Sequence, residues 1–135
     1  MRTLGQKRAE YALEKVLAIP EGKKKDFKSF SAGAPSTILQ NGFGQALAFW
    51  LSKGTDKNLK IKEDDKHIIL LDMIWKWLPY EKDDVKNSFV EKDKNKTRTD
   101  FIRQLSGMDQ TKYFSAQRET LALLEWVKRY ANADL

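Results

Sequence analysis

The chain of 135 residues contains no cysteine and a single histidine. Without cysteine there is no disulfide framework, no thiolate nucleophile and no zinc site built on cysteine. A lysine-rich chain without cysteine is typical of the reducing cytosol, so we expect a cytoplasmic protein. The length is enough for one hydrophobic core and too short for two good ones, so residues 1–135 are expected to form a single domain.

Long hydrophobic runs are also missing. The longest apolar stretch, from Ile68 to Leu78, is interrupted by Asp72 and Lys76. A membrane-spanning helix needs about 20 predominantly apolar residues, and a secretory signal needs a continuous apolar segment after its basic start. The sequence has neither pattern, so we expect a soluble protein.

Sustained alternation of polar and apolar residues, the pattern of a half-buried strand, is absent. Apolar residues instead recur three and four positions apart, which indicates helices. The fold class is therefore predicted to be all-α, a single compact bundle of five to seven helices. The expected helical segments are residues 3–19, 23–30, 36–52, 67–78, 99–107 and 111–132, with a further short helix around Val85, Phe89 and Val90 and a mobile loop over 91–98.

Glycine and proline are scarce, with 7 and 3 residues. Gly33-Ala34-Pro35 is expected to end the segment 23–30, and Pro35 then suits the first turn of the next helix, where its missing N–H is not needed. Gly42 and Gly44 fall inside the predicted helix 36–52, where each glycine costs about 1 kcal/mol relative to alanine. Close approach of another backbone or a ligand would offset this cost. A break of the helix at this point is the alternative.

Positive charge is concentrated in the first half of the chain. The net charge of the whole sequence is +6, residues 1–60 hold eleven Lys and Arg against five Asp and Glu, and residues 61–135 hold fourteen of each sign. Localised positive charge is typical of a surface that binds nucleic acid or an acidic partner, although a solvated lysine face has the same composition.

Helical spacing brings some of these basic residues together. Lys7 and Arg8 precede Lys15 by about two turns, so the three can line one flank of the first helix. Lysine and arginine in such a strip contact phosphates rather than base edges, which predicts binding that is independent of sequence. The candidate nucleic-acid-binding residues are Lys7, Arg8, Lys15, Lys23, Lys24, Lys25 and Lys28, with Lys53, Lys57 and Lys60 as looser members.

Catalytic residues are few. His67 is the only histidine, and it begins an apolar helix beside Asp64 and Asp65, where a capping or half-buried role is expected. Acid–base catalysis by imidazole would need a partner arranged by the fold. No phosphate-binding loop, catalytic residue or metal-ligand cluster is evident in the sequence, so we expect no enzymatic activity, no metal and no cofactor.

One segment resembles a known family signature. Residues 41–49, Asn41-Gly42-Phe43-Gly44-Gln45-Ala46-Leu47-Ala48-Phe49, resemble the Asn-Gly-x-Gly-Gln-x-x-Ala-Phe segment of the small subunit of type III-B CRISPR effector (Cmr) complexes, the fifth Cmr protein. Two flanking matches occur in the same order, Arg8-Ala9-Glu10-Tyr11-Ala12 near the start and Leu124-Glu125-Trp126-Val127-Lys128-Arg129-Tyr130-Ala131 near the end. Phe43 stands where leucine is more usual.

The resemblance implies a non-catalytic structural subunit for antiviral defence. Copies of such a subunit stack beside the guide RNA–target RNA duplex and contact the backbone and large subunits of the complex. Guide–target pairing supplies sequence specificity, so only backbone-directed positive charge is needed. The resemblance also implies a monomer in isolation, and it assigns Asn41, Gly42, Gly44 and Gln45 to subunit contact or close packing. The alternatives are a free-standing helical adaptor for an acidic protein and a small nuclease that uses His67.

Overall fold

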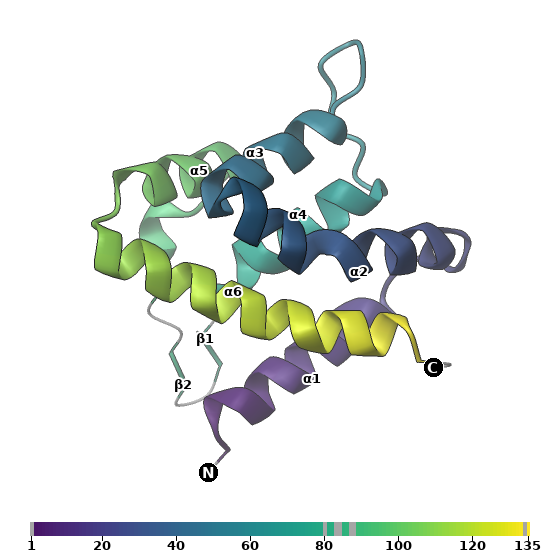
Figure 1. Cartoon of the computed structure of the whole chain (residues 1–135), viewed down its shortest axis with the longest axis horizontal. Helices are drawn as coiled ribbons and strands as arrows, with labels where there is room; N and C mark the ends of the chain where they lie inside the picture. Colours follow the sequence, from purple (N-terminus) through teal and green to yellow (C-terminus); the bar gives the residue numbers. More distant parts are fainter. Residues whose placement is uncertain (1, 80, 83–84, 87–88, 134) are drawn as a thin grey trace.

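The computed structural model describes residues 2–79, 81–82, 85–86, 89–133 and 135, and this part of the chain is mainly helical (Figure 1). Its elements are α1 (Leu4–Leu17), η1 (Glu21–Lys23), α2 (Lys24–Asn41), α3 (Phe43–Lys53), α4 (Lys66–Trp77), β1 (Glu81–Lys82), β2 (Val85–Lys86), η2 (Lys92–Lys94), α5 (Arg98–Gly107) and α6 (Gln110–Ala131). Six α-helices lie within the described residues, so the predicted all-α bundle is confirmed.

The longest helix, α6, crosses the molecule and packs against α1 and α2, while α4 lies behind them and packs against α2 and α3 (Figure 1). Helix α4 is apolar on most sides, as its sequence predicts, and Ile68, Leu71 and Ile74 have no exposed surface. Its Trp77 side chain is also fully buried. The strongly apolar segment therefore forms the centre of the hydrophobic core.

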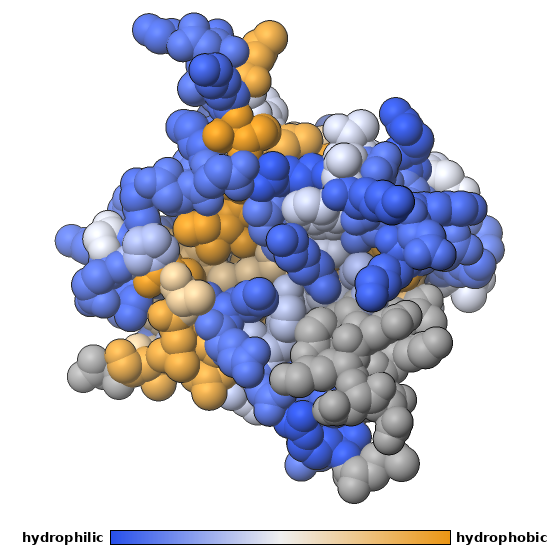
Figure 2. All heavy atoms as spheres, turned by 180° about the vertical axis from the view of Figure 1, so that it is seen from behind, coloured by the Kyte–Doolittle hydropathy of each residue, from blue (hydrophilic) through white to orange (hydrophobic). Residues whose placement is uncertain are grey.

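Some large apolar side chains remain outside the core. On the back of the molecule, hydrophobic patches lie between hydrophilic side chains (Figure 2). Isolated exposed apolar residues are normal, whereas grouped ones mark contact surfaces. Among the residues whose burial is described, the exposed large apolar ones are Leu17, Leu39, Leu59, Leu135, Phe49 and Phe114.

Helix α2 continues through Pro35, so the predicted end at Gly33-Ala34-Pro35 is wrong. Proline inside a helix removes one hydrogen bond and costs about 3 kcal/mol. The buried stripe of α2 spans the proline without interruption, with Phe27 and Ser31 before it and Ile38 after it. Because this stripe is covered by the rest of the bundle, we infer that packing outweighs the local penalty.

A second correction concerns Gly42, where the predicted continuous helix 36–52 is broken. Gly42 has φ 91° and ψ 151°, a backbone conformation that side chains with a Cβ rarely adopt. Its N–H donates to the carbonyl of Ile38 at 2.9 Å and its carbonyl accepts from the N–H of Ala46 at 3.0 Å. Gly42 therefore ends α2 and begins α3 within a single residue.

The polar segment after α4 also differs from its prediction. The backbones of β1 and β2 pair as antiparallel strands, Glu81 with Lys86 and Lys82 with Val85, where a short helix around Val85 was expected. In the predicted mobile loop, Asn95 is buried, its backbone carbonyl accepts from Trp75 Nε1 at 3.0 Å, and its side-chain amide donates to the Trp75 carbonyl at 2.9 Å. This double contact fixes the segment against α4.

Candidate nucleic-acid interface

Most of the basic strip predicted along α1 makes contacts within the fold. Lys7 has 5% of its surface exposed. The guanidinium of Arg8 donates to both carboxylate oxygens of Glu119 on α6, at 2.6 and 2.7 Å. Glu119 is itself buried, and it also accepts a hydrogen bond from Trp77 Nε1 at 2.8 Å. Arg8 therefore belongs to a buried polar cluster that joins α1, α4 and α6, rather than to an open surface.

The sequence carries a signal for this cluster in the position of Glu119. Glu119 lies three residues after Ala116 and four before Leu123, both buried on the apolar stripe of α6. A charged residue on such a stripe is rarely buried unless it is paired. Its presence there predicts a basic partner from another helix.

Lys15 is partly exposed, and its Nζ lies 5.3 Å from the centre of the Tyr11 ring. A cation over an aromatic face is held by the ring quadrupole. Lys15 is thus partly engaged within α1.

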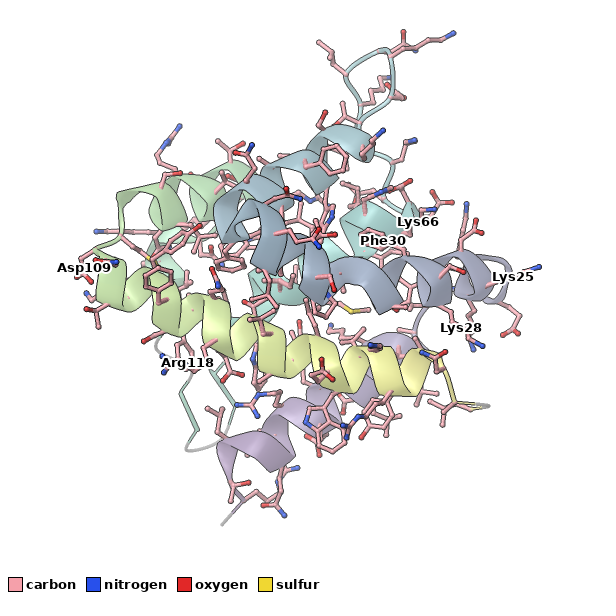
Figure 3. All side chains as sticks on the ribbon, viewed as in Figure 1. Lys25, Lys28, Phe30, Lys66, Asp109 and Arg118 are labelled. Carbon is pink, nitrogen blue, oxygen red and sulfur yellow. The ribbon has the colours of Figure 1, made fainter. Side chains whose placement is uncertain are left out.

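The lysines of η1 and the first turns of α2 lie together at one end of the molecule. Lys23 pairs with Asp64 at 3.5 Å and Lys24 pairs with Glu21 at 3.2 Å, both in exposed ion pairs. Lys25 and Lys28 are exposed and project beside the C-terminal end of α6 (Figure 3). Exposed ion pairs are weak and exchange readily with other anions. These four lysines form an accessible basic group, and we call them the α2 lysine cluster.

The looser basic residues lie elsewhere. Lys57 and Lys60 belong to the loop between α3 and α4, which protrudes at the top of the view in Figure 1, whereas the α2 lysine cluster lies at the right. Lys53, at the end of α3, has its Nζ 5.4 Å from the Phe49 ring centre. The basic residues of positions 1–60 are therefore divided between separate surfaces.

The two glycines of the signature segment have separate structural reasons. Gly42 supplies the backbone conformation described above. Gly44 is in the first turn of α3, and its N–H donates to the Tyr113 hydroxyl at 2.8 Å. A helix that begins at a glycine has no capping side chain of its own, so the Tyr113 hydroxyl satisfies one of its unpaired N–H groups. Tyr113 was not identified as a partner of this segment from the sequence.

Replacing Tyr113 with phenylalanine should lower the free energy of unfolding by about 1 kcal/mol, because the Gly44 N–H loses its acceptor. The phenylalanine ring keeps the edge-on contact with Phe43, whose centre lies 5.9 Å from that of Tyr113. Urea unfolding of both proteins, with an unchanged dependence on denaturant, measures the difference. Equal midpoints would show that the hydroxyl does not stabilise α3.

The other two predicted contact residues of the signature segment, Asn41 and Gln45, face outward. Asn41 and Gln45 are exposed, and with Ala48 and Phe49 they line a shallow groove of about 530 Å³ between the end of α2 and α3. Phe49 has 52% of its surface exposed. An exposed aromatic side chain bordered by amides resembles the composition of protein contact surfaces.

His67 has the half-buried, helix-starting position that the sequence predicts. Its Nδ1 lies 2.9 Å from Asp65 Oδ1, its backbone N–H donates to the same oxygen at 2.8 Å, and its ring packs against Phe30. Burial of Asp65 acts to raise its pKa, but the hydrogen bonds and charge of His67, with Lys62, outweigh burial and hold this pKa below its ordinary value. These contacts describe a helix cap.

Another charged cluster is also accounted for by contacts within the fold. Arg98 donates to both oxygens of Asp72 at 2.8 Å and to Glu63 at 2.7 Å. Hydrogen bonds from Arg98 to Asp72 are the main cause that raises the pKa of the guanidinium above its ordinary value.

Within the described residues, no group of three or more His, Asp or Glu side chains is arranged to hold a metal ion. None of the helices described there is long and apolar enough to cross a membrane.

Comparison with known protein families agrees with the resemblance of the signature segment. A family model described as CRISPR-associated protein (Cas_Cmr5) matches residues 4–134, which is nearly the whole chain. The matched range includes the signature segment 41–49, the partly buried Arg8–Glu119 pair and the α2 lysine cluster. The chain therefore belongs to the Cmr5 family of type III-B CRISPR-associated proteins.

Proposed function

We propose that this protein is a non-catalytic structural subunit of a cytoplasmic type III-B interference complex, in which it contacts the backbone of the guide RNA–target RNA duplex. The family match over residues 4–134 is the observation that carries the proposal. The RNA contacts are assigned to Lys15 and the α2 lysine cluster, Lys23, Lys24, Lys25 and Lys28. Lys7 and Arg8 are omitted, because one is buried and the other is held by Glu119.

Exposed lysines near the start of α2 suit contact with phosphates. Lys24, Lys25 and Lys28 lie within about one turn of helix, so their ammonium groups can follow a single strand. Lysine contributes a mobile point charge without base recognition. In an RNA-guided complex, base pairing supplies the sequence specificity, so such contacts are sufficient.

Contact with other subunits is assigned to the groove beside the signature segment. Asn41 and Gln45 provide exposed amides, and Phe49 provides exposed apolar surface. Leu39, with 66% of its surface exposed, is on the neighbouring α2 helix. Burial of these apolar groups against the backbone subunit, the large subunit or a second copy would be favourable at about 25 cal/mol per Å².

Binding of the isolated protein to a single-stranded RNA oligonucleotide at several salt concentrations tests the lysine assignment. We expect weak binding. The logarithm of the binding constant should fall linearly with the logarithm of salt concentration, with a slope of about −0.7 for each phosphate neutralised. Lys25→Gln/Lys28→Gln should reduce the magnitude of that slope by about 1.4, because two contacts are lost.

The matched control is Lys57→Gln/Lys60→Gln. It changes the net charge by the same amount, but on the protruding loop between α3 and α4. If both pairs of substitutions reduce the slope equally, net charge rather than the α2 lysine cluster governs binding, and the assignment is wrong.

Purification of the tagged protein from its host tests membership of the complex. Recovery of guide RNA and other Cmr subunits would support the proposed function, and Phe49→Ser should reduce that recovery while leaving the isolated protein folded. RNase activity that His67→Ala abolishes would instead support the nuclease hypothesis, which needs His67 released from Asp65 and Phe30.

A further inference from the structure

A groove of about 400 Å³ lies where the C-terminal end of α6 meets the end of α1 and the beginning of α2. Its lining includes Val16, Ile19 and Phe27, which are buried in the core. Figure 3 shows Lys25 and Lys28 projecting from α2 on the side of α6. The volume is within the range of pockets that hold small organic groups.

The two sides of the groove differ in chemistry. Lys24, Lys25 and Lys28 contribute positive charge on the side of α2. Leu17 and Leu135 contribute apolar surface on the other side, with 51% and 56% of their surfaces exposed. Hydrophobic surface is visible at the lower left of Figure 2, the end of the molecule at which Figure 1 places the C-terminus.

An aromatic ring stands in the same lining. Tyr130 is partly exposed, and its ring is stacked on Trp126, with centres 5.6 Å apart and planes 26° apart. Because Trp126 already restricts this ring, Tyr130 would lose little conformational freedom on contact with a flat ligand. Glu21 is the acidic side chain described in the lining, and it pairs with Lys24 at 3.2 Å.

We propose that the groove accommodates one unstacked nucleotide of single-stranded RNA, with the base against Tyr130 and Leu17 and the adjacent phosphates on Lys25 and Lys28. This inference rests on the proposed function and adds a site for a base to the backbone contacts. Lysines next to an aromatic ring are the combination by which proteins bind single strands without sequence preference. An acidic peptide would use the lysines but would leave the apolar and aromatic side unmatched.

Two RNA probes separate contact with the base from contact with the backbone. One is a short oligoadenylate, and the other has the same length and phosphates but lacks its bases. Stacking of one base on an aromatic ring should make the oligoadenylate bind roughly 5- to 160-fold more tightly than the probe without bases. Tyr130→Leu and Leu17→Ser should each remove most of this preference. Leu59→Ser is the matched control, because it removes another exposed leucine outside the groove lining and should leave the preference unchanged.

The outcomes distinguish this inference from the proposed function. Equal, salt-dependent binding of both probes would overturn the base site and leave the backbone contact intact. Binding of neither probe would contradict the RNA contact itself. A preference that survives Tyr130→Leu and Leu17→Ser would place the base elsewhere and overturn the inference. An acidic peptide would be the occupant if polyglutamate competes with oligoadenylate at equal charge concentration and if Leu17→Ser abolishes this competition. That result would also overturn the inference.

Discussion

Replacement of Arg8 with methionine should lower the free energy of unfolding by about 3–5 kcal/mol, the usual consequence of removing one partner of a buried ion pair. The Glu119 side chain is 4% exposed and loses both guanidinium hydrogen bonds in this variant. The remaining Trp77 Nε1–H cannot neutralise a buried carboxylate. The large effect therefore comes from the charge left behind, rather than from the lost contact area.

Chemical denaturation of the purified protein measures this effect, and two further variants make it specific. Arg2→Met breaks the ion pair of Arg2 with Glu10, which is more than one-third exposed, and should cost less than about 1 kcal/mol. Arg8→Met/Glu119→Met removes both charges and should be more stable than Arg8→Met alone. If Arg8→Met costs no more than Arg2→Met, Glu119 is not a buried charge that depends on Arg8.

This prediction also affects how RNA-binding experiments are designed. A substitution at Arg8 that weakened RNA binding would report partial unfolding as readily as a lost phosphate contact. Lys25 and Lys28 are exposed at the start of α2, so their substitution should leave the stability nearly unchanged. The α2 lysine cluster therefore gives the interpretable test of RNA contact, and Arg8 does not.

Helical periodicity was sufficient to predict the class of the fold. The predicted segments 3–19, 67–78 and 111–132 correspond to α1, α4 and α6. Helices α1 and α6 each have a regular apolar stripe, and α4 is apolar on most sides. Such stripes indicate which side of a helix is buried, and burial of that side supplies most of the stability of a helix in a protein. Their ends were predicted within a few residues, and the structure places capping side chains there, Thr3 before α1 and Asp109 before α6.

Local signals were misleading where distant packing decides the conformation. Pro35 was expected near a helix start, yet the buried stripe of α2 carries the helix through it. At Gly42 the opposite occurs, and the chain uses the conformational freedom of glycine to break the helix. The outcome at Pro35 does not follow from propensity, because it depends on surfaces contributed by other helices. The break at Gly42 is the alternative that the sequence left open.

The candidate site was harder to predict than the fold for the same reason. Helical spacing correctly placed Lys7, Arg8 and Lys15 on one helix, but Glu119, the partner of Arg8, is 111 residues further along the chain. Charge counts cannot distinguish a lysine that is buried, as Lys7 is, from one that is exposed, as Lys25 is. The groove at the end of α6 likewise joins segments from both ends of the sequence.

Replacement of Gly54 with alanine should destabilise the protein by about 1–3 kcal/mol, the range for overpacking a well-ordered core. Gly54 follows α3 with φ −86°, so alanine would adopt this backbone conformation without strain. An added Cβ would instead overlap the outer side-chain carbons of Ile68, which has no exposed surface into which to move. The end of α3 would have to separate from the beginning of α4.

Gly33→Ala provides the matched control, because Gly33 lies within α2 and a Cβ there meets no atom within 4 Å. This change should stabilise the protein by up to about 1 kcal/mol through helix propensity, so the two substitutions have opposite signs. Removal of the overlapping carbons in Ile68→Ala should cost less in the Gly54→Ala background than in the original protein, and a double-mutant cycle by denaturation measures the difference. Additive effects of the two substitutions would show that Gly54 is not required by its contact with Ile68.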